Sequence, residues 1–331
     1  MTNLKPRGSA QDFWNTIKGI SVNDIIREAS RPISLALVGE AEKRGDALAA
    51  LFNPETVGEP HGRALPEPAF VQEFDSTHAD DSFPRKPNVF DVVIDVGGGR
   101  NDPPERTRIY SLVELGGWEP ALDRILEDRP EIALALARNF PAFRRRVAEN
   151  VIATTATANA QFALVTGITS AFPVLGVLLP VNGLSDTLML TKNQIMMTLR
   201  LAAAYGLDIS FKARGKELAP LLINALGWRA IARELVGAVP VVGFIARAGI
   251  AYAGTVTVGK SAMVYYETGE KIDKAQLQRW YREALESSKE KVRQLASAVK
   301  RRDKNQKALP PAEVNDDTVD AEMRDLPAAV R

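Results

Sequence analysis

Residues 151–185 read VIATTATANAQFALVTGITSAFPVLGVLLPVNGLS and contain no charged side chain. Within this run, residues 160–179 have about the length that a helix needs to cross a bilayer, roughly 20 residues. Prolines and glycines, among them Pro173, Gly176 and Pro180, interrupt the run and do not suit one straight helix. Two interpretations follow: a bent or re-entrant membrane hairpin, or a deeply buried hairpin of a soluble helical domain.

The composition of the whole chain narrows the function classes. Of its 331 residues, 45% are apolar and 25% are charged, as is typical of a globular protein with one or two domains. The formal net charge of +1 gives no argument for nucleic acid, so we expect no nucleic-acid partner. The absence of cysteine excludes disulfides, thiolate metal sites and cysteine nucleophiles. The two histidines, His61 and His78, match no metal-ligand spacing, and we expect neither a metal site nor catalytic residues.

Upstream of the uncharged run, the apolar pattern predicts a small α/β unit. Residues 33–38, ISLALV, are short and apolar and stop at Gly39, which indicates a buried strand. Residues 41–52 then have helical spacing, so strand, glycine and helix begin a βα unit. Further strands are expected at residues 69–74, 90–95 and 108–113.

From Trp118 onward the pattern is helical to about residue 302. We therefore expect a mostly α fold. A helical C-terminal domain with two Gly/Pro-interrupted apolar hairpins follows a small, degenerate P-loop-like α/β unit. The expected parts are an N-terminal arm and helix (1–30), the α/β unit (31–115), the helical domain (116–270), a charged amphipathic helix (271–304) and a disordered tail (305–331).

The stretch after the first strand lies where a P-loop would lie in a nucleotide-binding protein. A P-loop needs G-x-x-x-x-G-K-[ST], because its Lys and hydroxyl group hold the phosphates and Mg²⁺. Here Gly39 and Gly45 are one residue too far apart, Asp46 replaces the Lys and Ala47 replaces the Ser or Thr. Because Asp46 would repel phosphates, we predict no ordinary Mg-nucleotide binding and no cofactor.

The second expected strand leads into a weak GTPase-like pattern. Asp95-Val-Gly-Gly98 matches D-x-x-G, the loop that approaches the γ-phosphate in GTPases, although the glycines could equally form an ordinary turn. No N-K-x-D element for guanine recognition follows it. A vestigial nucleotide site would comprise Gly39, Gly45, Asp46, Asp95 and Gly98.

Polar residues recur at heptad spacing along the long helix expected at residues 184–205. They are Asp186, Asn193 and Arg200, and Arg247 lies within the second apolar stretch. In a bilayer such residues would face a partner helix or a cavity. In a soluble domain they would form a stripe that faces a partner or solvent.

Three consecutive arginines, residues 144–146, lie just before the uncharged run. They would suit a cytoplasmic flank beside anionic lipid, or they would form a solvated helix face.

Five stretches together resemble one bacterial family. They are RPISLALVG (31–39), ALARNFPAFRR (135–145), TKNQIMMTLRLAAAYG (191–206), WRAIARELVGAV (228–239) and AYAGTVTVGKSAMVYYE (251–267). They look like the YcjF-like domain of unknown function, which occurs beside or fused to Era-type GTPase domains. The resemblance is good over residues 130–270 and weaker over 22–55. It implies a membrane-associated helical domain behind a GTPase-like domain, and the departures at Asp46 and Ala47 argue against GTPase activity here.

We therefore expect a membrane-associated scaffold or regulatory protein with a pseudo-GTPase head and no catalysis. Its expected place is the inner, cytoplasmic membrane, with the head in the cytoplasm. Its expected partners are the lipid membrane and either other proteins or a second copy of the chain. One alternative is a GTPase that a partner completes and that uses GTP and Mg²⁺. Another is a soluble, cytoplasmic helical interaction protein.

Overall fold

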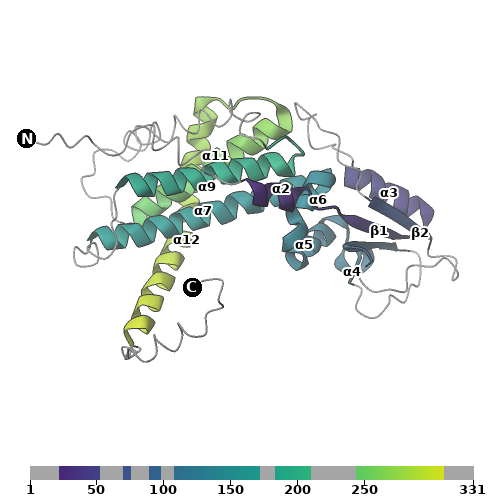
Figure 1. The fold of residues 1–331 in the computed structure, drawn as a ribbon, viewed down its shortest axis with the longest axis horizontal. Helices are drawn as coiled ribbons and strands as arrows, with labels where there is room; N and C mark the ends of the chain where they lie inside the picture. Colours follow the sequence, from purple (N-terminus) through teal and green to yellow (C-terminus); the bar gives the residue numbers. More distant parts are fainter. Residues whose placement is uncertain are drawn as a thin grey trace, which may run out of the picture.

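Helices dominate the structure, a computed structural model that describes residues 22–52, 70–75, 89–97, 108–171, 183–209 and 244–308. Of the described residues, 75% are helical, and the remainder includes one small parallel sheet (Figure 1). The expected mostly α fold with a small α/β unit is therefore confirmed. The Gly/Pro corners of both expected hairpins, the N-terminal arm up to residue 21 and the expected tail from residue 309 lie outside the described residues.

The sheet has four parallel strands in the order β2-β1-β3-β4. The strands are β1 (Ser34–Gly39), β2 (Phe70–Asp75), β3 (Val92–Gly97) and β4 (Ile109–Ser111). The two central strands, β1 and β3, are buried along almost their whole length, which explains why their sequences are continuously apolar.

One strand prediction was too long. The chain leaves β4 at Ser111, where a strand to residue 113 was expected, and turns into the short helix α4 (Leu112–Leu115). The Ser111 hydroxyl accepts a hydrogen bond from the Glu114 N–H and so caps this helix. Gly116 ends the helix in the left-handed conformation, with φ 83°.

Alternating side chains of the central strands belong to two different clusters. Leu35, Leu37 and Ile94 share one large core with α3 (Ala41–Phe52) and with the helical part of the molecule. Ala36, Val38 and Val93 point to the opposite face and form a smaller cluster, against which Phe74, Phe90 and Ile109 pack.

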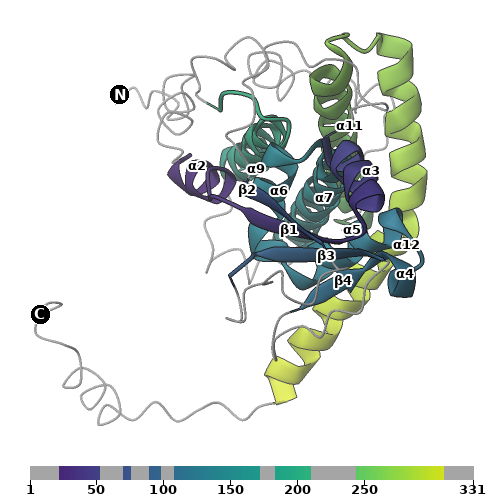
Figure 2. The same ribbon diagram turned by 90° about the vertical axis from the view of Figure 1, so that its right-hand side faces the viewer.

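The helical part contains a bundle of long helices beside the sheet (Figure 1). Its elements are α2 (Asn23–Ala29), α5 (Trp118–Asp128), η1 (Pro130–Ile132), α6 (Ala133–Asn139), α7 (Pro141–Ala171), α9 (Gly183–Ala204), α11 (Phe244–Thr268) and α12 (Lys274–Ala308). Pro130 begins η1 and Pro141 begins α7, positions where the fixed φ of proline suits the start of a helix. The carboxyl-terminal part of α12 projects beyond the rest of the bundle (Figure 2).

The sheet and the bundle share a single hydrophobic core. Leu37 and Ile94 of the sheet belong to the same cluster as Phe140, Tyr205 and Tyr266 of the helical part. The core is therefore continuous across the domain boundary expected at residues 115–116.

Helix α2, which was expected to belong to the N-terminal arm, packs against α6 and α9. Among the residues described, we find no helix that combines the length and the apolarity needed to cross a membrane.

Candidate functional site

The carboxyl edge of the sheet is where the predicted nucleotide residues meet. In open parallel sheets, ligands bind outside the carboxyl ends of the strands, at the point where the strand order reverses. Here that point lies between β1 and β3. Val38 pairs with Asp95 and Gly39 pairs with Gly97, so the structure brings the predicted residues Gly39 and Asp95 together.

The phosphate-binding loop itself is missing from this edge. Helix α3 begins at Ala41, two residues after the end of β1, and the Arg44 N–H already donates a helical hydrogen bond to the Glu40 carbonyl at 2.9 Å. Gly45 and Asp46 consequently lie exposed within α3 rather than in a loop that could surround phosphates. The fifth predicted residue, Gly98, lies outside the described residues.

Between β1 and β3 the edge is closed by close contacts. A Cβ atom on Gly39, whose φ is +145°, would lie 2.5 Å from a Val96 methyl carbon and 2.7 Å from the Gly97 carbonyl oxygen. The Glu40 N–H donates to that same oxygen at 3.3 Å. The Gly97 N–H donates to Asp95 Oδ1 at 2.8 Å. The N–H groups of Glu40 and Gly97 at this point are therefore already bonded within the protein.

Between β1 and β2 the edge is occupied by the Arg44 side chain, which is 12% exposed. Its guanidinium group donates to the carbonyl oxygens of Gly39 and Phe74, the latter at 3.0 Å, and pairs with Glu73 at 3.3 Å. Arg44 thus neutralises Glu73 and caps the ends of two strands, so its charge is not available to a phosphate. Arg44 was not among the predicted site residues.

A second group of polar residues connects three helices inside the bundle. Asn193 of α9 donates from Nδ2 to Asn159 Oδ1 of α7 at 2.7 Å. Asn159 in turn donates from Nδ2 to Thr255 Oγ1 of α11 at 2.9 Å. The Thr255 hydroxyl donates to the Ala251 carbonyl at 2.8 Å, and Gln194 adds a longer contact of 3.5 Å to Thr255. Asn159 and Thr255 are completely buried, and these hydrogen bonds offset the loss of water that burial entails. We call Asn159, Asn193 and Thr255 the polar lock.

The other predicted polar residues, Asp186, Arg200 and Arg247, do not take part in the polar lock. Arg200 of α9 pairs with Glu28 of α2 at 2.9 Å, so it faces a helix of the same chain. Asp186 and Arg247 lie on the backbones of α9 and α11, and their side chains are outside the described part of the structure. Sequence reasoning selected Asn193 but missed Asn159 and Thr255. An asparagine within an uncharged apolar run was the one local signal for Asn159.

The arginines before the uncharged run are bound within the protein. Arg144 is 5% exposed and donates from Nε to the Ala137 carbonyl at 3.3 Å. Arg145 pairs with Glu149 at 3.1 Å. Arg146 pairs with two carboxylates of α5, those of Glu119 and Asp123. The expectation of a solvated or lipid-facing stripe therefore fails for Arg144, and Arg146 serves to connect α7 with α5.

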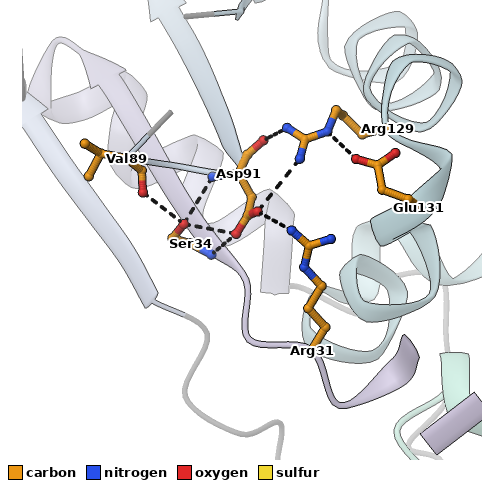
Figure 3. Close-up of polar contacts among 6 residues, drawn as sticks. All are labelled: Arg31, Ser34, Val89, Asp91, Arg129 and Glu131. Atoms are coloured by element: carbon orange, nitrogen blue, oxygen red, sulfur yellow. Dashed lines mark hydrogen bonds and ion pairs between the residues drawn. The ribbon is translucent and has the colours of Figure 1, made fainter. Parts of the chain in front are cut away.

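At the amino edge of the sheet, Asp91 collects partners from several segments (Figure 3). Its Oδ2 atom accepts hydrogen bonds from the Ser34 N–H at 3.0 Å and from the Ser34 hydroxyl at 3.1 Å. Its Oδ1 atom accepts from Arg31 at 3.1 Å. Arg129 donates to the Asp91 carbonyl and also bonds Glu131 at 2.6 Å, and this hydrogen bond lowers the pKa of the Glu131 carboxyl.

This cluster lies at the edge opposite the ligand-binding end of parallel strands, and all its charges are paired. We therefore assign it to holding the strands against the helical part. No group of three or more His, Cys, Asp or Glu side chains within the described ranges is placed to hold a metal ion.

Comparisons with known proteins give no further direction: no protein-family model, no curated protein and no solved structure matches this chain. The resemblance to the YcjF-like domain therefore stays a prediction.

Proposed function

We propose that the protein is a membrane-associated scaffold or regulatory protein with a pseudo-GTPase head that performs no catalysis. The observation that carries the proposal is the closed carboxyl edge of the sheet. Gly39 is held against Val96 and Gly97, and Arg44 fills the neighbouring position with three bonds to the protein. The carboxyl end of β1 is thus occupied by contacts within the protein.

Charge also opposes a nucleotide at this edge. Among the described side chains at this edge, the carboxylates of Glu40, Glu73 and Asp95 outnumber the cations of Lys43 and Arg44. Lys43 already pairs with Glu40 at 3.2 Å. A triphosphate would have to displace these pairs and then lie beside the released carboxylates, which would repel it.

The test is calorimetry of the full chain with Mg-GTP and Mg-ATP at millimolar concentration. An unrelated active GTPase in the same buffer serves as the positive control. We expect no binding heat and no phosphate release. Micromolar binding that Asp95→Ala weakens would overturn the proposal and favour a GTPase that a partner completes.

The membrane part of the proposal is supported by the uncharged run at residues 151–185. Its Pro- and Gly-containing segment, residues 172–182, lies outside the described residues. Cell fractionation tests this part: we expect the chain in the membrane fraction after both high-salt and carbonate washes. Recovery as a monodisperse species without detergent would refute it.

One observation favours a second candidate, a helical interaction protein that works in water. One face of the first half of the uncharged run is covered by neighbouring helices. Ala160 and Leu164 of α7 are completely buried in a cluster with Ala248 and Val292, and Asn159 is hydrogen-bonded inside the bundle. The same fractionation separates the two candidates, since this one predicts full recovery in the soluble fraction.

A further inference from the structure

Helix α12 carries its charges unevenly. In its first fifteen residues, 274–288, three Lys or Arg are set against two acidic residues. In the remainder, residues 289–308, eight Lys or Arg are set against two acidic residues. We call residues 289–308 the basic segment. Its first three cations, Lys289, Lys291 and Arg293, belong to the part whose side chains the structure describes, and all three are exposed.

Packing places the start of the basic segment beside the uncharged run. Val292 of α12 is 1% exposed and shares one buried cluster with Ala160 and Leu164 of α7 and with Ala248 of α11. Helix α12 therefore crosses the bundle at the level of the second half of α7. From this crossing the basic segment continues beyond the bundle (Figure 2).

The crossing lies at the end of the bundle that is away from the sheet. Helix α11 runs antiparallel to α7, since Gly259 packs against Ile152 while Ala248 packs beside Leu164. The start of α11 thus lies near the carboxyl end of α7, which is far from the sheet (Figure 1). At this same end the chain leaves α7 at Ala171 and continues through the rest of the uncharged run.

The arginines that precede the uncharged run in the sequence do not supply a positive charge at this end. They lie near the start of α7, on the side of the sheet. Arg144 is buried, Arg145 pairs with Glu149, and Arg146 pairs with two carboxylates of α5. The exposed cations next to the far end of the uncharged run come instead from α12, more than a hundred residues later in the chain.

We propose that the basic segment of α12 binds anionic lipid headgroups and thereby determines which end of the bundle faces the membrane. This inference rests on the membrane part of the proposed function. Val292 and Leu295 pack on the bundle, so the contact with lipid is made by the cations and not by an apolar face. Clusters of about four to eight Lys or Arg beside a membrane segment attract anionic lipids, and each cation near the surface strengthens binding about fivefold.

Nucleic acid is the other polyanion that a basic helix could bind. The basic segment contains no aromatic residue that could stack on a base. Its place beside a run without charges is the arrangement expected at a bilayer surface, where cations flank the apolar segment. Both observations favour lipid, and the experiment below includes nucleic acid as a competitor.

The test is flotation of the purified full chain with lipid vesicles. One set consists of phosphatidylcholine alone, and the other of phosphatidylcholine mixed with phosphatidylglycerol. The variant that combines Lys289→Gln, Lys291→Gln and Arg293→Gln removes the described cations of the basic segment.

The first half of α12 offers a matched control. Lys274→Gln, Arg279→Gln and Arg282→Gln together remove the same charge from exposed positions of the same helix. These positions are centred about 20 Å from the others along the helix axis. That distance exceeds the screening length of about 8 Å at physiological salt, so the control acts on the overall charge of the chain and not on the lipid contact.

We expect the natural chain to bind the mixed vesicles at least about tenfold more tightly than phosphatidylcholine alone. The variant of the basic segment should weaken binding to mixed vesicles by about tenfold or more. The control should weaken it by less than about threefold. Neither variant should change binding to phosphatidylcholine or the midpoint of thermal unfolding, because all six side chains are exposed.

Three outcomes would overturn the inference. Equal binding to both kinds of vesicle would show that lipid charge plays no part. Equal losses in the two variants would show an effect of overall charge without a site on α12. Binding of duplex DNA or RNA as tightly as mixed vesicles would assign the basic segment to nucleic acid. A chain that resists carbonate extraction yet binds both kinds of vesicle equally would keep the proposed function and refute this inference alone.

Discussion

At Gly259, helix α11 approaches α7 so closely that a side chain has no room. A Cβ atom there would lie 2.6, 2.9 and 3.1 Å from the Cγ1, Cγ2 and Cδ1 atoms of Ile152. Ile152 is 4% exposed and belongs to the main core, so its side chain cannot move into solvent. Gly259→Ala should therefore push the two helices apart.

The size of the effect follows from two opposing contributions. Overpacking a well-packed core destabilises by about 1–3 kcal/mol. Replacing Gly by Ala within a helix stabilises it by about 1 kcal/mol. Gly259→Ala should thus lower the free energy of unfolding by about 0–2 kcal/mol. Gly254→Ala is the matched control on the same helix, because nothing lies within 4 Å of its Cβ position, and it should give the stabilising contribution alone.

The measurement is denaturant-induced unfolding of both variants and of a third chain that combines Gly259→Ala with Ile152→Ala. The difference between the two glycine variants isolates the overpacking contribution, about 1–3 kcal/mol. The double variant should be less destabilised than the sum of its single changes, because Ile152→Ala makes room for the new methyl group. Equal stabilisation by Gly259→Ala and Gly254→Ala would refute the close packing of α11 on α7.

Three further changes test other parts of the structure. Gly45→Ala, in an exposed turn of α3 with open space around its Cβ position, should raise the free energy of unfolding by about 0.5–1 kcal/mol, whereas the same change at a loop glycine with positive φ would lower it. Asn159→Ala leaves the buried hydrogen-bonding partners of Asn159 unsatisfied and should lower the free energy of unfolding by about 1–3 kcal/mol. The control is Asn150→Ala, an exposed change on the same helix, which should alter the free energy of unfolding by less than about 0.5 kcal/mol. Burial, with a hydrogen bond to Glu267, raises the pKa of the Tyr205 phenol well above its usual range. Above the unfolded pKa near 10, the unfolded chain loses the phenol proton while the folded protein keeps it. The free energy of unfolding therefore falls as pH rises further, by about 1.4 kcal/mol per pH unit. Tyr205→Phe should reduce that alkaline loss in unfolding measurements across about pH 9–11, and an unchanged pH dependence would contradict the burial of the phenol.

Much of the fold could be predicted from the sequence because its signals are local. Continuous apolar residues up to Gly39 predicted β1, and helical spacing predicted α3 over the residues that the structure shows. Pro130 and Pro141, which begin η1 and α7, are equally local signals of where a helix starts. The strand expected to reach residue 113 failed for an equally local reason, because Ser111 caps a helix whose first residues, Leu112 and Val113, continue the apolar pattern of the strand.

The polar contacts could not be predicted because their partners are far apart in the chain. Arg44 reaches the carbonyl of Phe74, 30 residues away. Asp91 bonds Ser34 across 57 residues, and Asn159 bonds Thr255 across 96. No spacing rule relates such pairs, since the pairing of strands and the packing of helices bring them together. The glycine spacing, Asp46 and Ala47 were the signals in the sequence that this edge of the sheet departs from a P-loop.

The arrangement of the two sheet edges gives the α/β unit a mechanical role under the proposed function. At the carboxyl edge, Arg44 and Gly39 close the place where a ligand would bind. At the amino edge, Asp91 ties β1 and β3 to the segments that lead into the helices. Phe140, completely buried and 5.4 Å from the ring of Phe52, then places the start of α7 against α3, the helix that follows β1. Under the proposed function, the sheet therefore serves to fix one end of the bundle, with which it shares its hydrophobic core.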